Sequence, residues 1–477
     1  MLMTGQVLSS EEIKKIHEGS IRLLRETGIK FPGERAMDIL EAGGARVDRD
    51  KETAYISEDM VKKALKTAPK KFTLGARNSA FDLEMPSASS SYNLDGTGVS
   101  VLEYDSGSKH AAGVKDIADA AVVFDDIDIG TVLWLPAAAQ DVPGGARGIV
   151  GTGTAFMNCR KHFQDEVKNI REVRYVMEMA KAILGSEEEV RRRKIYSVTY
   201  CTVAPLSHDR EMMEATMELT KYEAPVLIYP MPACGTTGPA SLYSNIVMAN
   251  AEALSALVLF QLTTPGTPLI FGAALGIVNM RSGIFLEGAP ETSVQLMAMT
   301  EMGKYYGLPT IVAGCLTDAK VPGMQAVLEK FLTSMPLVLA GVDVVQGIGL
   351  LESSMTLSLE QMLIDEEIGR LCRRLAQGVD ASPDKELFDD IAAVGQEGHF
   401  LKQKSTRKLF RTDEFYLPGS LIDRGSYDEW TNMGSPDMFS KAHERVSAIL
   451  KEGPKEPLDS GAEKTIKEIM DEAVAKL

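Results

Sequence analysis

From about residue 90, short apolar runs rich in Val, Ile and aromatic residues alternate with longer stretches of helical periodicity. Eight such runs occur, at 91–95, 131–136, 161–165, 195–203, 225–231, 268–274, 309–315 and 342–347. Helical stretches separate most of them, at 114–124, 170–184, 209–221, 242–261, 291–306, 325–339 and 357–375. Strands that alternate with helices pair in parallel, because each helix returns the chain to the same end of the sheet.

Eight strand–helix units predict an α/β protein with a (β/α)8 TIM barrel, a fold that typically needs about 250 residues. Three of the later strands begin at a proline (Pro225, Pro268 and Pro309), where a missing N–H costs little. The alternative is a doubly wound sheet, which would favour a Gly-rich fingerprint after the first strand. Neither Asp95–Gly98 nor Gly148–Thr154 completes that fingerprint, and we expect tight turns at both places.

The chain divides into three parts by composition. Residues 1–85 predict a helical segment packed on the barrel, with helices that begin near Ser9 and end at Gly43 and Pro69. Residues 86–378 are predicted to form the barrel and to carry the catalytic site. Residues 379–477 are again helical and charged, and predict a C-terminal helical extension.

The charge balance excludes several classes of partner. With 51 Lys and Arg against 67 Asp and Glu, the net charge is −16, which repels nucleic-acid phosphates and anionic lipids.

The most apolar window, 253–262, is shorter than the roughly 20 residues that span a bilayer. Five scattered cysteines and no secretory signal pattern predict a cytoplasmic protein without disulfides. No HExxH or similar spacing predicts a metal site.

The predicted C-terminal ends of the strands carry aromatic and acidic side chains and few cations. These residues are Asp95, Trp134, His162, Tyr200, Tyr229, Phe271, Asp318, Gln346 and Glu352. Barrel enzymes place their active sites at this end. The set suits a quaternary ammonium, which ring faces attract by about 0.5–2 kcal/mol per contact. Alternatively, Tyr200, Tyr229 and Phe271 point outward beneath the helices, because alternation cannot be followed in runs this apolar.

No nucleophile stands out. The sequence has no GxSxG elbow, and Cys315, at the end of the seventh run, is as readily a small buried hydrophobe. Lys320 follows that run and is a candidate for a Schiff base. His162 and His208 either line the mouth of the barrel or are hydrogen-bonded structural histidines.

An ordered set of motifs covers nearly the whole chain. It consists of SIRLLRETGIKF at 20–31, AGGA at 42–45, AP at 68–69, APLS at 204–207, YEAP at 222–225, PMP at 230–232, TGP at 237–239, QLTTPGTP at 261–268, NMRSG at 279–283, YGLP at 306–309, TDAK at 317–320, SLEQMLIDE at 358–366, and Asp423-Arg424 with Trp430 and Gly434. No single motif is diagnostic, but in this order they resemble the trimethylamine methyltransferase family. The chain contains only standard residues, so it resembles the family members that lack pyrrolysine. The family pattern has Asp-Met-Arg where this chain has Asn279-Met280-Arg281, and an acidic residue near Gly323.

The resemblance implies demethylation of a quaternary amine, such as glycine betaine, proline betaine, carnitine or γ-butyrobetaine. The methyl group would pass to Co(I) of a separate corrinoid protein, with no cofactor tightly bound to this chain. The leaving group is a neutral tertiary amine, which requires neither a general acid nor zinc. The protein would desolvate the cation, aim one methyl group at the mouth of the barrel and admit the corrinoid. A homo-oligomer is also expected.

Under this resemblance, each strand-end residue acquires an expected role. We expect the cation cage to comprise Tyr92, Trp134, Tyr200, Tyr229 and Phe271. Asp95 would supply a counter-charge and Gln346 would contact polar groups of the substrate. Arg281, His208 and Lys320 are candidate donors to a betaine carboxylate, with Arg281 first because its guanidinium binds in bidentate fashion.

Two other functions fit the same residues. A non-catalytic betaine-binding protein would use an aromatic cage equally well. A barrel aldolase or isomerase would use Lys320 or a carboxylate base, and borohydride trapping would reveal its Schiff base.

Overall fold

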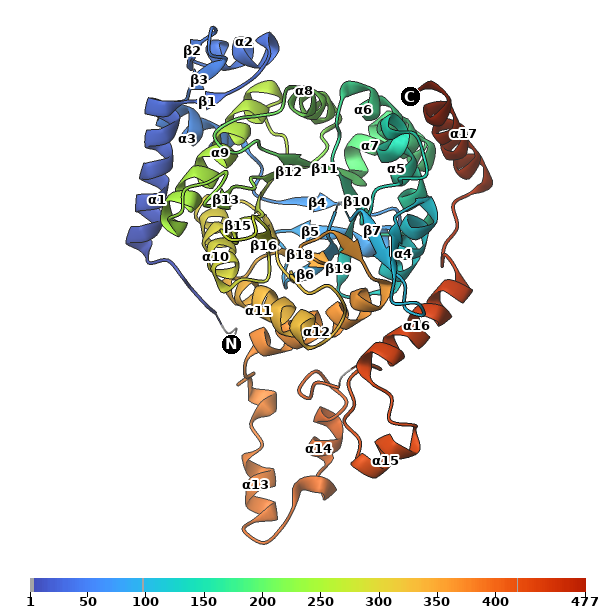
Figure 1. Cartoon of the computed structure of the whole chain (residues 1–477). Coiled ribbons are helices and arrows are strands. Elements are labelled where there is room, and N and C mark those ends of the chain that lie inside the picture. The colour runs from blue at the N-terminus through green and yellow to red at the C-terminus, as the bar shows by residue number, and fades with distance from the viewer. Residues whose placement is uncertain (1–3, 97, 418) are drawn as a thin grey trace.

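The computed structural model describes residues 4–96, 98–417 and 419–477, and it is built around a closed barrel of eight parallel strands (Figure 1). The barrel strands are β6 (Ser91–Leu94), β9 (Gly130–Trp134), β10 (His162–Asp165), β11 (Tyr196–Cys201), β12 (Val226–Tyr229), β14 (Leu269–Ala273), β17 (Thr310–Ala313) and β18 (Val344–Ile348). They follow one another around the barrel in chain order, and β18 closes it against β6. The predicted TIM barrel is confirmed, and each predicted apolar run holds one strand.

An outer ring of helices covers the barrel. These helices are α4 (Val114–Asp126), α5 (Arg147–Asn158), α6 (Ile170–Leu184), α7 (Glu187–Arg193), α8 (Arg210–Leu219), α9 (Leu242–Thr263), α10 (Pro290–Tyr305), α11 (Met324–Ala340) and α12 (Leu359–Gln377). By length and composition α9 could cross a membrane, but 89% of its apolar window is buried within the fold. It is therefore a core helix, held between the barrel and the N-terminal segment.

The glycine-rich stretch at 148–154 is helical and not the tight turn expected from its sequence. It forms most of α5, and its glycines allow close packing. A Cβ on Gly151 would lie 2.6 Å from Leu135, and one on Gly153 would lie 2.6 Å from Met470. Small residues on a helix face allow neighbouring elements to approach in this way, although glycine lowers helix propensity.

The N-terminal segment packs on the outside of the barrel and closes one of its ends. It contains α1 (Ser10–Arg22), α2 (Glu34–Ala42), α3 (Glu58–Thr67), the small sheet of β1 (Ile29–Lys30), β2 (Arg46–Asp48) and β3 (Thr53–Tyr55), and the hairpin of β4 (Phe72–Leu74) and β5 (Leu83–Met85). Ser9 caps α1 in a capping box with Glu12. After β4, the carbonyl oxygen of Gly75 lies 2.7 Å from Nδ1 of His162, which stands at the start of β10. The hairpin therefore covers the end of the barrel where the strands begin.

Seven short strands belong to the loops that follow barrel strands. They are β7 (Ser100–Leu102), β8 (Lys109–Ala111), β13 (Ala233–Cys234), β15 (Gly276–Val278), β16 (Phe285–Leu286), β19 (Leu350–Leu351) and β20 (Thr356–Leu357). They form two small sheets, β13-β15-β16 and β19-β20-β7-β8. These sheets give fixed positions to loops at the C-terminal end of the barrel.

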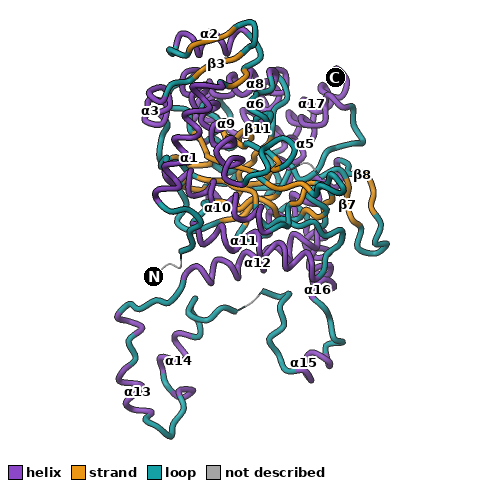
Figure 2. Tube along the Cα trace, turned by 60° about the vertical axis from the view of Figure 1, so that its left-hand side comes forward, coloured by secondary structure: helices purple, strands orange, loops and turns teal. Residues whose placement is uncertain are grey.

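The C-terminal extension begins and ends against the barrel but leaves it in between. It contains α13 (Phe388–Val394), α14 (Lys404–Leu409), α15 (Tyr427–Asn432), α16 (Met438–Glu452) and α17 (Ser460–Lys476). Helix α16 packs on α12 and α4, and α17 packs on α5 and α6. Between them, α13, α14 and α15 extend away from the barrel into solvent (Figures 1 and 2).

Candidate active site

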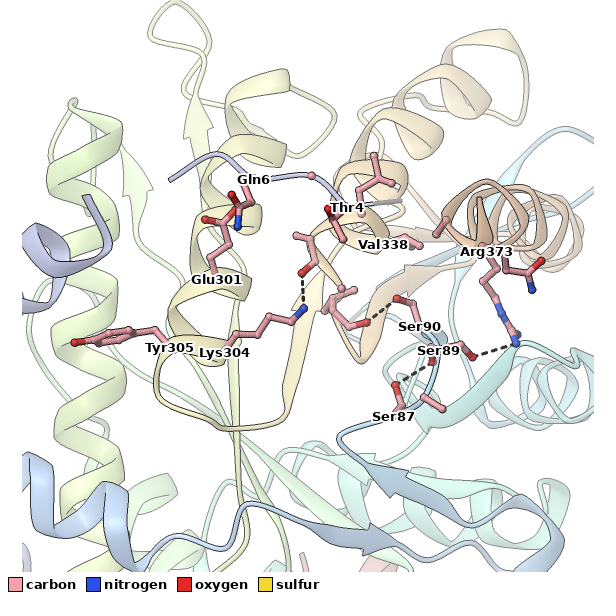
Figure 3. A pocket seen from close by; sticks show the side chains of 18 of the residues that line it. Thr4, Gln6, Ser87, Ser89, Ser90, Glu301, Lys304, Tyr305, Val338 and Arg373 are labelled. Atoms are coloured by element: carbon pink, nitrogen blue, oxygen red, sulfur yellow. Dashed lines mark hydrogen bonds between the residues drawn. The ribbon is translucent and has the colours of Figure 1, made fainter. Parts of the chain in front are cut away.

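A cavity of about 600 Å3 lies at the end of the barrel where the strands begin (Figure 3). Its walls include Ser87 and Ser90, just before β6, together with Lys304 and Arg373 from the outer helices. Barrel enzymes carry their chemistry at the opposite end, where the strand C-termini and the following loops gather. The candidate site therefore lies among the residues at those strand ends.

Two aromatic rings meet at the C-terminal end of the barrel. Trp134 ends β9 and Tyr229 ends β12, and their ring centroids lie 5.9 Å apart with planes at 86°. Two further strands, β10 and β11, separate β9 from β12. The rings can meet only through the interior of the barrel, so both side chains point inward. A Cβ on Gly96 would lie 2.5 Å from the indole, so the glycine leaves room for Trp134.

Acidic side chains surround this ring pair. The indole Nε1 of Trp134 donates a hydrogen bond to Asp165 at 3.2 Å. Next to Asp165, the carboxylate of Glu166 accepts a hydrogen bond from the thiol of Cys201 at 3.3 Å. Burial raises the pKa of the Tyr229 hydroxyl, and the nearby charges of Asp95, Cys201 and Glu287 raise it further. The ring pair therefore lies near acids contributed by two barrel strand ends, those of β6 and β10, and by the loop after β16.

The hydroxyl of Ser354 bridges two of these acids. Its Oγ is hydrogen-bonded to Oδ2 of Asp95, and it lies 2.8 Å from Oε2 of Glu287. A serine hydroxyl has only one hydrogen to donate. With both contacts made as hydrogen bonds, one of the two carboxyl groups must carry a proton and donate it to Ser354. The bridge therefore suits a carboxyl pair with a single negative charge.

The pKa values agree with this arrangement. Burial raises the pKa of Asp95 to about 6, although hydrogen bonds from Ser354 and Gly96 oppose the shift. Burial, followed by the charge of Asp95, raises the pKa of Glu287 to about 8. Burial disfavours the charged form of a carboxyl group, and a neighbouring negative charge disfavours it further. Near neutral pH, Asp95 is ionised and Glu287 holds the proton.

The loop that carries Ser354 has an unusual backbone. Glu352, Ser353 and Ser354 have φ values of 58°, 54° and 61°, so three consecutive non-glycine residues lie in the left-handed region. Side-chain contacts hold this turn, since Ser353 donates a hydrogen bond to Asp318 at 2.9 Å and Glu352 pairs with Lys109. Strained backbone of this kind is concentrated at functional sites.

Gln346 lies deeper in the barrel, on β18. It is fully buried, and its Oε1 accepts a hydrogen bond from Asn93 at 3.4 Å. The Nε2 of Gln346 and Oδ1 of Asn93 have no hydrogen-bond partner among the described residues. Buried amide groups without partners are uncommon in native proteins and mark a place where a ligand or water completes the bonding.

Three of the expected cage residues lie on the outer side of their strands. The Tyr92 ring packs against α12, since a Cβ on Gly369 would lie 2.8 Å from its edge. The Phe271 ring contacts Tyr306 at 5.7 Å, beyond the end of α10. Tyr200 packs edge to face against Phe260 of α9 at 4.9 Å. The structure corrects the expected cage: these rings are buried beneath helices and do not join the pair at the mouth.

His208 is also buried on the outer side of the barrel. Its Nδ1 lies 2.8 Å from the Tyr200 hydroxyl, its Nε2 lies 2.9 Å from Oγ of Ser255, and its ring stacks on Phe31 at 4.4 Å. Burial lowers the pKa of His208 to about 3, so the ring is neutral. Its position and charge are those of a structural histidine and not of a carboxylate clamp.

The two remaining expected cations lie on loops at the mouth. Arg281 is exposed in the turn between β15 and β16, where its backbone N–H donates to Asn279. Lys320 is exposed in the loop after β17 and donates to the carbonyl oxygen of Asp318 at 2.6 Å. Among the described residues, no cluster of three or more His, Cys, Asp or Glu side chains has the arrangement of a metal site.

Several site residues were not singled out from the sequence. Asp165 is the last residue of the predicted run 161–165, Glu166 follows it directly, and Ser354 lies two residues after Glu352. Glu287 comes from the excursion of β15 and β16 after β14. A further one is Lys330 of α11, whose fully buried ammonium pairs with Asp365 at 2.8 Å. It also donates to the carbonyl oxygens of Cys315 and Gly347, at 2.8 and 3.1 Å. The sequence signal that could have indicated this buried ion pair is a single lysine, Lys330, within an otherwise largely apolar helix.

The chain is similar to known proteins over nearly its whole length. The family model for trimethylamine methyltransferase (MTTB) matches residues 2–476. Trimethylamine methyltransferase MttB of Methanosarcina barkeri is 32% identical over 472 residues, covering 98% of this chain and 95% of the relative. Glycine betaine methyltransferase of Desulfitobacterium hafniense (strain Y51) is 31% identical, covering 94% of this chain and 93% of the relative.

Solved structures agree on the fold. The monomethylamine methyltransferase MtmB of Methanosarcina barkeri superposes with a TM-score of 0.50 at 10% sequence identity, covering 97% of this chain and 91% of that one. At this identity the likeness concerns the barrel architecture alone. The match of the family model over almost the full length, with relatives above 30% identity, determines the family. The chain belongs to the trimethylamine methyltransferase family and is a methyltransferase.

Proposed function

We propose that this protein moves a methyl group from a quaternary amine, such as a betaine, to the Co(I) of a separate corrinoid protein. The observation that carries the proposal is the contact between Trp134 and Tyr229 beside the Asp95–Glu287 carboxyl pair. A quaternary ammonium has no N–H to donate, so it is recognised by ring faces and by negative charge rather than by hydrogen bonds. This site offers both.

The charge of the carboxyl pair matches such a substrate. With Asp95 ionised and Glu287 protonated, the pair carries one negative charge against the single positive charge of the ammonium. Asp165, which accepts the indole N–H, holds the Trp134 ring in place. Burial raises the pKa of Asp165 far above its usual range, so this acid adds little further negative charge.

The polar end of the substrate would meet different residues. A betaine carboxylate needs donors, and Arg281 and Lys320 are cations on exposed loops at the mouth. We propose Arg281 first, because its guanidinium binds a carboxylate in bidentate fashion. The buried Nε2 of Gln346, which has no partner in the part of the chain that the structure describes, is the proposed contact for polar atoms that reach into the barrel.

The surface around the mouth supports docking of another protein. The loops after the barrel strands expose a ring of apolar side chains, which we call the rim: Val99, Val203, Met231, Met280, Ile284, Val321, Met324 and Met355. Met324 is 92% exposed and Met280 is 74% exposed. Apolar patches of this kind mark interaction surfaces, and methionine adapts its shape to a partner. We propose that the corrinoid protein docks on the rim.

In this proposal the residues of the chain act by position and desolvation. The aromatic pair and Asp95 hold the ammonium in a site poor in water, where its charge is less well solvated than in solution. The transition state disperses that charge, so the displacement becomes easier. The corrinoid of the partner protein would supply the cobalt nucleophile that takes the methyl group. The leaving tertiary amine is neutral and requires no proton from Glu287.

The first experiment mixes the purified protein with chemically reduced cob(I)alamin and a panel of quaternary amines, and follows the visible spectrum of the cobalt. Formation of methylcobalamin with one amine would identify the reaction and its substrate. A betaine that binds in calorimetry but is not demethylated, even with the cognate corrinoid protein present, would favour a binding protein. The five free cysteines fit a proposed site of action in the reducing cytoplasm.

A further inference from the structure

Residues 380–437 form an arm that projects from the barrel. The arm leaves the end of α12, carries α13, α14 and α15, and returns at α16 (Figures 1 and 2). Its base is attached to the barrel, since the Tyr416 hydroxyl donates to Glu367 at 3.0 Å and Arg374 donates to the carbonyl oxygen of Glu414 at 2.9 Å. Beyond that base, the arm extends sideways from the barrel and does not cover the mouth.

Almost none of the described residues of the arm is buried. Leu421 is its only buried residue among those the structure describes. Nine large apolar side chains of the arm are exposed: Phe388, Ile391, Phe400, Leu401, Phe410, Phe415, Leu417, Tyr427 and Met433. Ordering a backbone costs roughly 1–2 kcal/mol per residue, which is normally offset by apolar burial. An ordered arm that exposes its apolar residues needs a partner to cover them.

Charge alternates in sign along the arm, because a basic segment lies between two acidic stretches, and the second of these, residues 412–437, carries six carboxylates against one arginine. Residues 380–398, the acidic segment, carry six carboxylates against one lysine, a net charge of −5. Residues 399–411, the basic segment, carry five Lys and Arg and no carboxylate, a net charge of +5. A hydrogen bond from Ser405 to Asp390 joins the two segments. No ion pair joins them within the described chain.

We propose that the arm binds the arm of a second copy of this chain in a two-fold symmetric contact. In such a contact the acidic segment of each copy faces the basic segment of the other, so both charge patterns are matched at once. A partner carrying one sign of charge would face like charge in either the acidic or the basic segment. The exposed apolar side chains, among them Phe388 and Phe410, become the covered centre of the contact.

Charge reversal of either segment tests this pairing. In an acidic-arm variant, Lys404→Glu, Arg407→Glu and Lys408→Glu make both segments negative. In a basic-arm variant, Glu386→Lys, Asp389→Lys and Glu397→Lys make both segments positive. Each variant should repel its own copy, but a mixture of the two should pair, because every contact then joins opposite charges.

Light scattering coupled to size-exclusion chromatography, on full-length protein at about 10 µM, gives the mass of each sample. The wild type should have a mass that is an even multiple of 51.8 kDa. Each reversed variant should have half that mass or less, and the mixture should recover the wild-type mass. A control with the same charge change outside the arm, Lys66→Glu, Lys71→Glu and Lys451→Glu, should keep the wild-type mass.

A second measurement uses the wild type alone, so it does not depend on the folding of a variant. The dissociation constant of the assembly should rise about 10-fold between roughly 0.1 M and 1 M salt, because salt screens the facing charges. A monomeric wild type overturns the proposal, and the partner of the arm would then be a different protein. Reversed variants that assemble like the wild type also overturn it, as does a mixture of two folded variants that stays monomeric.

Discussion

Trp134 and Tyr229 meet edge to face at 5.9 Å although their strands are not neighbours in the barrel. The contact brings together two aromatic rings from segments that lie far apart in the sequence. Of the five aromatic residues expected to form the cage, these two alone meet at the strand ends. The affinity of the site for a cation therefore rests on few side chains.

Replacing Trp134 by Ala should weaken binding of the quaternary amine substrate by about 10-fold or more, because a desolvated cation–π contact contributes roughly 2 kcal/mol. Trp134→Phe should lose less, since it keeps a ring face. Isothermal titration calorimetry with the substrate measures the difference. Phe271→Leu is the matched control, because Phe271 packs beneath α10. Equal affinity of Trp134→Ala and wild type would exclude the ring from the site.

Titration of the carboxyl pair should make substrate binding depend on pH. As pH rises from 5 to 7, Asp95 ionises near its pKa of about 6, and affinity for a cation should rise about 10-fold. Ionisation of Glu287 near its pKa of about 8 should strengthen binding again. Glu287→Gln should remove the upper step only. Affinity that stays constant from pH 5 to 9 would contradict a role for the pair.

The same pair should lower the stability of the protein at high pH. Both pKa values lie above the usual range near 4, so between pH 4 and 8 the folded protein binds more protons than the unfolded chain. The free energy of unfolding therefore falls as pH rises through this window. Glu287→Gln should flatten the decline between pH 6 and 9 in urea denaturation, whereas the exposed Glu444→Gln should not. A decline of the same slope in both variants would assign it to other groups.

Much of the fold could be predicted because β-branched and aromatic runs, bounded by helical periodicity, locate all eight strands. The direction of side chains within those strands could not. Parallel strands are buried on both faces, so Tyr200, which points out, and Tyr229, which points in, lie in equally apolar runs. Orientation is decided by register around the closed barrel, which involves residues far apart in the sequence.

Of the two carboxyl groups in the pair, only that of Asp95 could be placed at the site from the sequence. Asp95 directly follows a strand, and its place could be inferred from the barrel topology. Glu287 reaches the site from the β15–β16 excursion, whose path depends on pairing with β13. The left-handed turn at 352–354 contains no glycine, so its sequence does not indicate positive φ values. Its backbone is held instead by side-chain contacts, such as the hydrogen bond from Ser353 to Asp318.

Gln346→Met should lower the rate of methyl transfer by about 10-fold, with a melting temperature close to that of the wild type. The substitution keeps the volume of the side chain and removes an amide nitrogen that has no partner among the described residues, but it also removes the long hydrogen bond from Asn93, so the two effects on stability oppose each other. Steady-state kinetics with cob(I)alamin and circular dichroism measure the two effects. Loss of helical signal in step with loss of rate would assign Gln346 to the core alone.

The ion pair of Lys330 and Asp365 should contribute strongly to the geometry of the mouth. Lys330→Met leaves a buried carboxylate unpaired and should cost about 3–5 kcal/mol, whereas Lys330→Met with Asp365→Leu should recover much of that loss. Lys62→Met breaks an exposed pair with Glu58 and should change the stability very little, because solvent screens that pair. Chemical denaturation compares the three variants. Equal losses in the single and double variants would show that the carboxylate finds another partner.

The rim makes a prediction that separates partner docking from chemistry. Met280→Asp and Met324→Asp place a charge in the exposed apolar ring and should raise the KM for the corrinoid protein about 10-fold. The rate with free cob(I)alamin should stay at the wild-type level, because both side chains are largely exposed, whereas the aromatic pair is buried. Leu375→Asp changes an exposed apolar residue at the far end of α12 and serves as the control. If the rim variants lose the reaction with free cob(I)alamin as well, the rim belongs to the active site. If they leave both reactions unchanged, the corrinoid protein docks elsewhere.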